Sequence, residues 1–131
     1  MKKQGIFNSK IAAVVASMGH TDLLGVVDAG FPISDLTQKI DLIVKPGLPA
    51  FLEVLENILT ELYIEEVIVA NELIERNPSL IKQLMNLCPN AKITQIPHEQ
   101  FKSDSLQCKA IIRTGECVPF SNIMLRAGVI F

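Results

Sequence analysis

The spacing of apolar residues changes several times along this chain, and each change marks the end of one element and the start of another. In the first segment apolar side chains recur every three or four residues: Ile11, Val14, Val15 and Met18. This spacing predicts a helix that Asn8 or Ser9 can cap and that Gly19 can end in a left-handed turn. The next run, LLGVVDA at 23–29, is apolar on both alternating faces, which is typical of a strand covered on two sides.

Strands and helices alternate along the rest of the chain. Short apolar or alternating runs predict strands at 39–44, 65–70 and 91–96. Pro49 opens a predicted helix whose buried face consists of leucines: Leu52, Leu55, Leu59 and Leu62. Asn77 and Pro78 begin another helix with four side chains facing inward: Leu80, Ile81, Leu84 and Met85. A short helical segment is expected at 97–105, and the chain closes with the run 108–115, a loop and strand-like runs at 123–125 and 128–131.

This alternation predicts the fold class. Strands that alternate with helices indicate a layered α/β fold with a central mixed, largely parallel sheet flanked by helices. The length fits a single domain over residues 1–131. Ligands of such sheets bind beyond the carboxyl ends of the strands, and Asp28 falls at the end of the predicted strand 23–29. Neither GxGxxG nor GxxxxGK[ST] occurs, so nucleotide phosphate binding has little support.

Composition leaves one question open. Hydrophobic residues make up 49% of the chain and charged residues 20%, yet there is no long apolar run. A surplus of apolar side chains is expected from a buried subunit interface, and equally from a well-filled core of strands covered on both faces. Composition alone does not decide between these interpretations.

Charge and cysteine content narrow the class of function. The formal charge is -2, and neither the 12 basic nor the 14 acidic residues gather into a block, so we expect no nucleic-acid and no membrane partner. The three cysteines are far apart and form no CxxC motif, which indicates reduced thiols rather than a disulfide framework. We expect no metal and no cofactor, with a zinc site of cysteines and histidines as the less favoured alternative.

The first residues resemble the start of a signal peptide, because MKK precedes the apolar stretch IAAVVASM. The apolar run from Ile11 to Ala16 is short, however, and residues 8–10 separate it from the basic start. We therefore expect these residues to be part of the mature fold and the protein to be cytoplasmic.

The two histidines carry the candidate chemistry. His20 follows the first predicted helix with Asp22 and Asp28 near it in sequence, and His98 has Lys102 one helical turn further on. A single histidine is more often structural or simply exposed, but these neighbours favour a functional interpretation. Imidazole exchanges protons near neutral pH, and a carboxylate can orient it or bind a hydroxyl group. This equipment suits proton transfer on small hydroxylated substrates better than acyl transfer, since no serine or cysteine lies in a nucleophile elbow.

Four segments, in order, give the chain a family resemblance: GHTD at 19–22, DAGFPI at 28–33, HEQFK at 98–102 and TGECVPFSNIMLRAGVIF at 114–131. Together they resemble the ribose pyranase family nearly end to end, with the fucose mutarotases as a more distant likeness. The resemblance implies an α/β fold, a ring-shaped homodecamer in the cytoplasm, and interconversion of the pyranose and furanose forms of D-ribose.

The resemblance also assigns roles to residues. It implies that His20 is the general acid, that Asp28 and His98 bind the sugar, and that Phe120, Ser121 and Asn122 form a closing binding segment. The family usually has tyrosine where Phe120 stands and often alanine where Ser121 stands. The fucose mutarotases lack the HEQFK segment, so His98 favours ribose.

As a hypothesis, opening of the ribopyranose ring requires a proton on the ring oxygen and loss of one from the anomeric hydroxyl, after which another hydroxyl closes on the aldehyde. His20 would supply the proton, and Asp28 would hold the sugar and orient the imidazole. No cofactor is required for this step. Two alternatives remain: an L-fucose mutarotase-like enzyme, and a sugar-binding module without catalysis.

Overall fold

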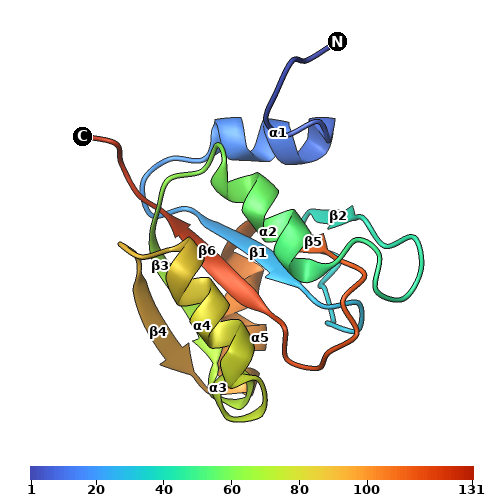
Figure 1. Cartoon of the computed structure of the whole chain (residues 1–131), viewed down its shortest axis with the longest axis vertical. Coiled ribbons are helices and arrows are strands. Elements are labelled where there is room, and N and C mark those ends of the chain that lie inside the picture. The colour runs from blue at the N-terminus through green and yellow to red at the C-terminus, as the bar shows by residue number, and fades with distance from the viewer.

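A computed structural model describes residues 1–131 and shows one mixed sheet between two layers of helix (Figure 1). The six strands lie in the order β2-β5-β1-β6-β3-β4. Their bounds are β1 Leu23–Val27, β2 Lys39–Asp41, β3 Ile64–Ala70, β4 Lys92–Ile96, β5 Cys108–Arg113 and β6 Ile123–Ala127. The helices are α1 Ser9–Ser17, α2 Phe51–Leu59, α3 Asn71–Arg76, α4 Pro78–Leu87 and α5 His98–Asp104, and a 3-10 turn follows at Ser105–Gln107. The predicted fold class is confirmed.

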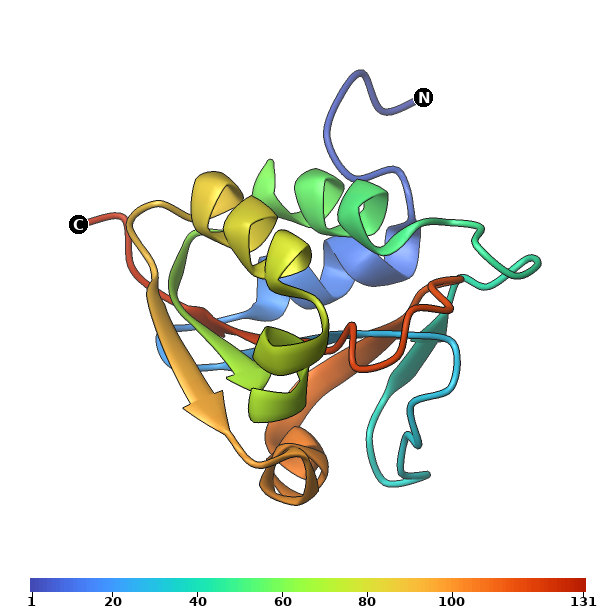
Figure 2. The same cartoon turned by 60° about the horizontal axis from the view of Figure 1, so that its bottom comes forward.

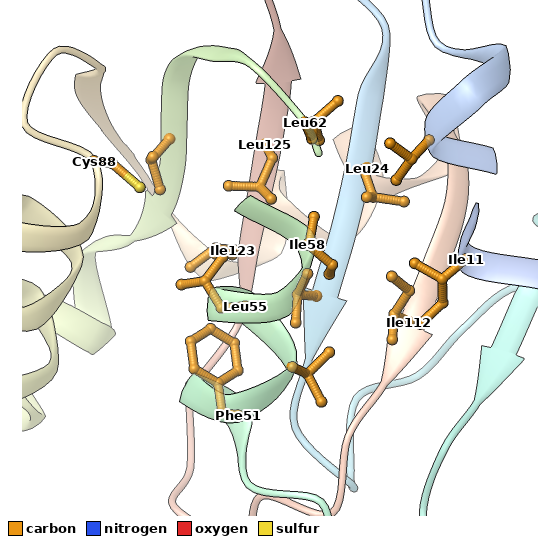
Figure 3. Close-up of a cluster of buried hydrophobic side chains, with 14 of the residues drawn as sticks. Ile11, Leu24, Phe51, Leu55, Ile58, Leu62, Cys88, Ile112, Ile123 and Leu125 are labelled. Atoms are coloured by element: carbon orange, nitrogen blue, oxygen red, sulfur yellow. The ribbon is translucent and has the colours of Figure 1, made fainter. Parts of the chain in front are cut away.

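The two faces of the sheet carry cores of unequal size. Helices α1 to α4 cover one face, where 23 buried residues form the main core. Figure 3 shows side chains of α2, among them Leu55 and Ile58, against Leu24, Ile123 and Leu125 of the sheet. The other face has a cluster of 8 buried residues, and α5 is the helix that covers it (Figure 2). Both faces of β1 are thus buried, as its continuous apolar sequence predicts.

The helix starts follow from their caps, but the first helix ends differently from the prediction. The Asn8 side chain accepts hydrogen bonds from the N–H groups of Lys10 and Ile11, and the Asn77 side chain caps α4 in the same way. Gly19 does not provide the left-handed stop: Met18 is already extended, and Thr21 is the residue with positive φ, at 72°. The Thr21 N–H donates to the Ala127 carbonyl at 2.9 Å, and this bond fixes the turn.

Two helix faces were predicted only in part. The inward face of α2 consists of Phe51, Val54, Leu55 and Ile58. Of the predicted leucines, Leu52 and Leu59 are half-buried and Leu62 is buried beyond the helix end. The helix begins at Phe51 rather than at Pro49, and Phe51 is its largest fully buried side chain. In α4, Leu80 and Leu84 are buried as predicted, whereas Ile81 is half-buried and Met85 is 55% exposed.

Three further differences concern where regular structure begins and ends. Helix α3 was not predicted, and it follows β3 without a linker. The predicted strand 39–44 is shorter, since β2 ends at Asp41. Residues 128–131 form no strand: the Gly128 N–H donates to the Tyr63 carbonyl just before β3 begins, and no strand backbone lies beyond it to pair with. Ile130 and Phe131 are consequently exposed.

Candidate functional site

The strand directions bring distant segments together at one edge of the sheet. β1 is parallel to β5, β5 to β2 and β3 to β4, while β6 is antiparallel to both β1 and β3. Five strands therefore end at the edge where β6 starts. Asp28 follows β1, His98 follows β4, and Asn122 precedes β6, so the topology delivers all three residues to this carboxyl edge.

Asp28 and Asn122 form a two-point pair at the centre of the edge. The Asp28 backbone N–H donates to Asn122 Oδ1 at 2.9 Å, and Asn122 Nδ2 donates to Asp28 Oδ2 at 3.1 Å. Both residues are buried, with Asp28 9% and Asn122 1% exposed. Each residue thus provides hydrogen-bond partners for buried polar groups of the other, and the pair connects the end of β1 to the start of β6.

Several donors converge on the Asp28 carboxylate. Its Oδ1 accepts from the Gly30 N–H at 3.0 Å, and the N–H groups of Phe31 and Phe120 also face the carboxylate. Burial raises the pKa of Asp28, and the hydrogen bonds from Gly30, Asn122, Phe31 and Phe120 oppose that rise. These donors fit an ionised carboxylate, and a hydrogen bond from a ligand hydroxyl to such a carboxylate would be charge-assisted.

Phe120 and His98 form a wall beside this carboxylate. Phe120 has a φ of 65°, a left-handed conformation that is unfavourable for a residue with a Cβ, and its carbonyl accepts from the Asn122 N–H at 2.8 Å. The rings of His98 and Phe120 meet edge to face with centroids 5.1 Å apart, and Phe31 approaches His98 from 6.3 Å. His98 Nδ1 is buried without a hydrogen-bond partner, so a ligand hydroxyl in the cavity could supply one.

These groups line an open cavity of about 400 Å³. A cavity of this size holds a small polar molecule with room for water. The lining residues are Asp28, Ala29, Gly30, Phe31, Pro32, His98, Glu116, Cys117, Pro119, Phe120 and Asn122. Four of the six predicted site residues therefore share one cavity.

Ser121 does not line the cavity with its side chain. It is 1% exposed, and its hydroxyl is buried without a hydrogen-bond partner. Any contact between Ser121 and a ligand would use the backbone, and its predicted role stays a prediction.

Sequence reasoning missed the loop that closes the other side of the cavity. The Glu116 carboxylate accepts from the N–H groups of Cys117 and Val118, at 2.9 Å each, and the Glu116 carbonyl accepts from the Ala29 N–H at 2.8 Å. These bonds hold the loop against the end of β1. The segment TGECVPFSN contained the relevant residues, but its letters alone do not tell a lining side chain from a supporting one.

His20 lies at the opposite edge of the sheet. It precedes β1 while Asp28 follows it, and a five-residue strand alone spans roughly 17 Å. The imidazole is 51% exposed, and its Nε2 lies 3.0 Å from Glu65 Oε2. Within one chain, then, the carboxylate beside His20 belongs to Glu65, and the expected contact between Asp28 and His20 is not formed.

Three further observations concern metal binding, membrane-spanning helices and Lys102. No group of three or more His, Cys, Asp or Glu side chains is arranged to hold a metal ion. No helix has both the length and the apolar character needed to span a bilayer. Lys102 pairs with Glu99 at 2.6 Å on α5 and does not line the cavity.

The fold and the cavity together define a small α/β protein with an open cavity, lined by polar and aromatic groups, at the carboxyl edge of its sheet. The chain belongs to the RbsD / FucU transport protein family, whose model matches residues 1–130. It is 48% identical over 131 residues to a D-ribose pyranase of Lactobacillus johnsonii, with both chains fully covered. It is 50% identical over 135 residues to a D-ribose pyranase of Thermotoga petrophila, again over the full length of both.

Two solved structures extend the comparison. The structure of Bacillus subtilis RbsD complexed with D-ribose matches with a TM-score of 0.96 and 45% identity, covering 100% of both chains. The fucose mutarotase of Streptococcus pneumoniae matches with a TM-score of 0.79 over 95% of this chain and 94% of its own. At 22% identity the second match shows a shared fold only.

Proposed function

We propose that this chain is a D-ribose pyranase, an isomerase that interconverts the pyranose and furanose forms of D-ribose for ribose utilisation. The observation that carries the proposal is the cavity around the Asp28–Asn122 pair, found in a chain that matches D-ribose pyranases over its whole length. The ribose complex of a relative with nearly the same backbone supports ribose as the ligand.

In this proposal the cavity residues bind the sugar. Asp28 accepts a hydrogen bond from a ribose hydroxyl, and His98 offers a ring nitrogen to another. The apolar face of the sugar packs on the Phe120 ring, and Asn122 holds Asp28 in place through the amide described above. The buried, unpartnered Nδ1 of His98 supports its assignment as a sugar ligand.

The general acid in the proposal is His20, and its position requires a second chain. His20 cannot reach a sugar in the cavity of its own chain, because β1 separates them. In a ring-shaped homodecamer, the amino edge of one chain can meet the carboxyl edge of the next and bring His20 to its cavity. There His20 gives its proton to the ring oxygen as the bond from that oxygen to the anomeric carbon breaks, and the anomeric hydroxyl passes its proton to solvent in the open cavity. On reclosure the attacking hydroxyl returns a proton to His20 and the aldehyde oxygen takes one from solvent, while Glu65 orients the imidazole from its own chain.

Exposed apolar side chains at both edges support this head-to-tail assembly. Tyr63, Ile130 and Phe131 are exposed at the amino edge, where His20 lies. Leu48 and Val118 are exposed beside the loop that lines the cavity. Contact between different surfaces of identical chains closes into a ring when the rotation between neighbours permits. The proposal places the reaction in the cytoplasm, where the three unpaired cysteines would stay reduced.

Saturation-transfer NMR on ribose tests the function. An isomerase accelerates magnetisation transfer between the pyranose and furanose signals, whereas a sugar-binding module only broadens them. L-fucose in the same experiment tests the mutarotase alternative. Binding of ribose without faster exchange would refute the assignment as an enzyme. Faster exchange of L-fucose but not of ribose would indicate a fucose mutarotase instead.

Complementation tests the shared site. Chains carrying His20→Gln and chains carrying Asp28→Asn are each expected to be nearly inactive, but co-expressed chains form mixed rings in which roughly a quarter of the sites combine both intact residues. Recovery of exchange activity in the mixed rings is therefore expected. Mixed rings as inactive as the two parent variants would contradict a site built from two chains.

A further inference from the structure

One cation, the guanidinium of Arg76, lies against the aromatic wall of the cavity. Arg76 is the last residue of α3, and its guanidinium carbon lies 5.0 Å from the centroid of the Phe120 ring. The chain has three arginines. Arg113 pairs with Asp41 and Arg126 pairs with Glu66, whereas Arg76 has no carboxylate within ion-pair distance. Its close partner is an aromatic ring.

Phe120 has an unfavourable backbone conformation, so contacts with its surroundings must stabilise it. Its φ of 65° is unfavourable for a side chain with a Cβ. In that conformation its N–H faces the Asp28 carboxylate and its carbonyl accepts from the Asn122 N–H, so its backbone supports both members of the central pair. The side chain has no polar group, so it is held by contacts with its ring, in addition to the hydrogen bond at its backbone.

Besides packing against the main core, the ring has two aromatic or charged partners, and they come from different elements. His98 from α5 meets the ring edge to face, and Arg76 from α3 places its charge over the ring. A guanidinium over an aromatic face is attracted by the ring quadrupole. Loss of the cation would leave His98 as the single aromatic or charged partner of the ring.

We infer that Arg76 is a positioning residue for the sugar site: through its cation–π contact it holds Phe120 against His98 and keeps the Phe120 N–H directed at Asp28. Arg76 does not line the cavity and acts on the sugar through Phe120. The inference rests on the proposed function, which it deepens by naming a residue that sets ribose affinity. It assigns Arg76 to binding rather than to proton transfer.

The test replaces Arg76 with methionine, which keeps much of the aliphatic stem and removes the charge. The exposed position makes misfolding unexpected. Arg76→Met should weaken ribose binding and raise KM about two- to fivefold, the range of an exposed cation–π contact, with a smaller change in kcat. Arg76→Lys keeps a cation and should recover most of the affinity. Lys82→Met removes an exposed charge from the neighbouring helix α4 and should leave affinity unchanged.

A double-mutant cycle with Phe120→Leu decides whether the effect runs through the ring. In the Phe120→Leu background, Arg76→Met should produce no further loss of ribose affinity. An equal loss in both backgrounds, or an equal loss in Lys82→Met, would overturn the inference in favour of a general charge effect. Absence of ribose exchange in the wild type would refute the proposed function, whereas wild-type exchange with an affinity insensitive to Arg76 would refute this inference alone.

Discussion

The two ends of β1 differ in how complete they are. At the carboxyl end, Asp28 is 9% exposed, receives several hydrogen bonds and opens onto a cavity. At the amino end, the His20 side chain is 51% exposed and has one carboxylate beside it. The cavity is therefore formed within each chain, whereas the proposed acid lies on an exposed surface. Under the proposed function, one chain can hold the sugar, and proton transfer requires His20 from the amino edge of another chain.

The largest effect is expected from removing the proposed general acid, His20. His20→Gln keeps side-chain size and a hydrogen bond but cannot pass a proton, so ribose exchange should fall by about 100-fold or more. Ribose affinity should change less than exchange, because the proposed sugar ligands Asp28 and His98 stay intact and the glutamine amide can keep a hydrogen bond to the sugar. Saturation-transfer NMR gives the first quantity and calorimetric titration gives the second. Undiminished exchange would remove His20 from the mechanism.

The next largest effect is expected at the carboxyl end. Asp28→Asn removes the proposed charge-assisted bond to the sugar and turns an amide N–H₂ toward donors from Gly30, Asn122 and Phe120. Ribose affinity should fall about 10- to 100-fold, corresponding to about 1.5 to 3 kcal/mol.

Asp22→Asn is the matched control for that variant. Asp22 lies at the amino edge, where its carboxylate accepts from the Gly19 N–H at 2.9 Å, a bond that an asparagine oxygen can keep. Ribose affinity should stay at the wild-type value. Equal losses from Asp22→Asn and Asp28→Asn in calorimetry would break the comparison between the two ends.

The pH dependence of stability should have opposite signs at Asp28 and at Glu66. Burial would raise the pKa of Glu66, but the Thr94 hydroxyl and Arg126 hold that pKa below 4.5. Its stabilising contribution is therefore present above pH 4.5 and lost as pH falls through the lowered pKa. The pKa of Asp28 is raised by burial, so its contribution weakens folding as pH rises from 3.8 through the raised pKa.

The variant Glu66→Gln measures the pH-dependent contribution of Glu66 to stability. Denaturant unfolding at neutral pH should show a loss of about 1 kcal/mol relative to the wild type, and the difference should vanish at pH values below the folded pKa of Glu66. A difference that stays constant from pH 7 to pH 3 would show that the ionised carboxylate contributes nothing.

The smallest effect is expected at Ser121. Its hydroxyl is buried without a partner, which costs folding free energy. Ser121→Ala should therefore raise the free energy of unfolding by about 0.5 to 1 kcal/mol and leave ribose affinity unchanged, because the side chain does not line the cavity. Weaker ribose binding by the alanine variant would show that the hydroxyl takes part in the site.

Local patterns predicted the sheet well and the site in part. The continuous apolar run of β1 and the caps of α1 and α4 are local features, and the structure has them where the sequence indicates. The placement of Asp28 beyond a strand end was predicted for the same reason. The ends of α1 and of the final strand were not, because they depend on hydrogen bonds to Ala127 and Tyr63 from distant parts of the sequence.

The relation between His20 and Asp28 shows why sequence proximity misleads. Eight positions separate them in sequence, but an extended strand lies between them and places them at opposite edges. Likewise, nothing in the pattern of residues 71–76 indicates that Arg76 would reach Phe120, since that contact depends on how α3 docks beside the start of β6.

Because β1 keeps His20 away from the cavity of its own chain, the proposed mechanism also makes turnover depend on protein concentration. Under the proposed arrangement each catalytic unit consists of parts of two chains, so its abundance follows mass action. Dilution below the dissociation constant of the ring would remove catalytic units while leaving every cavity able to hold a sugar. Specific activity would then fall on dilution, although the amount of sugar bound per chain stayed the same. The protein concentration at which specific activity begins to fall would measure the strength of the assembly.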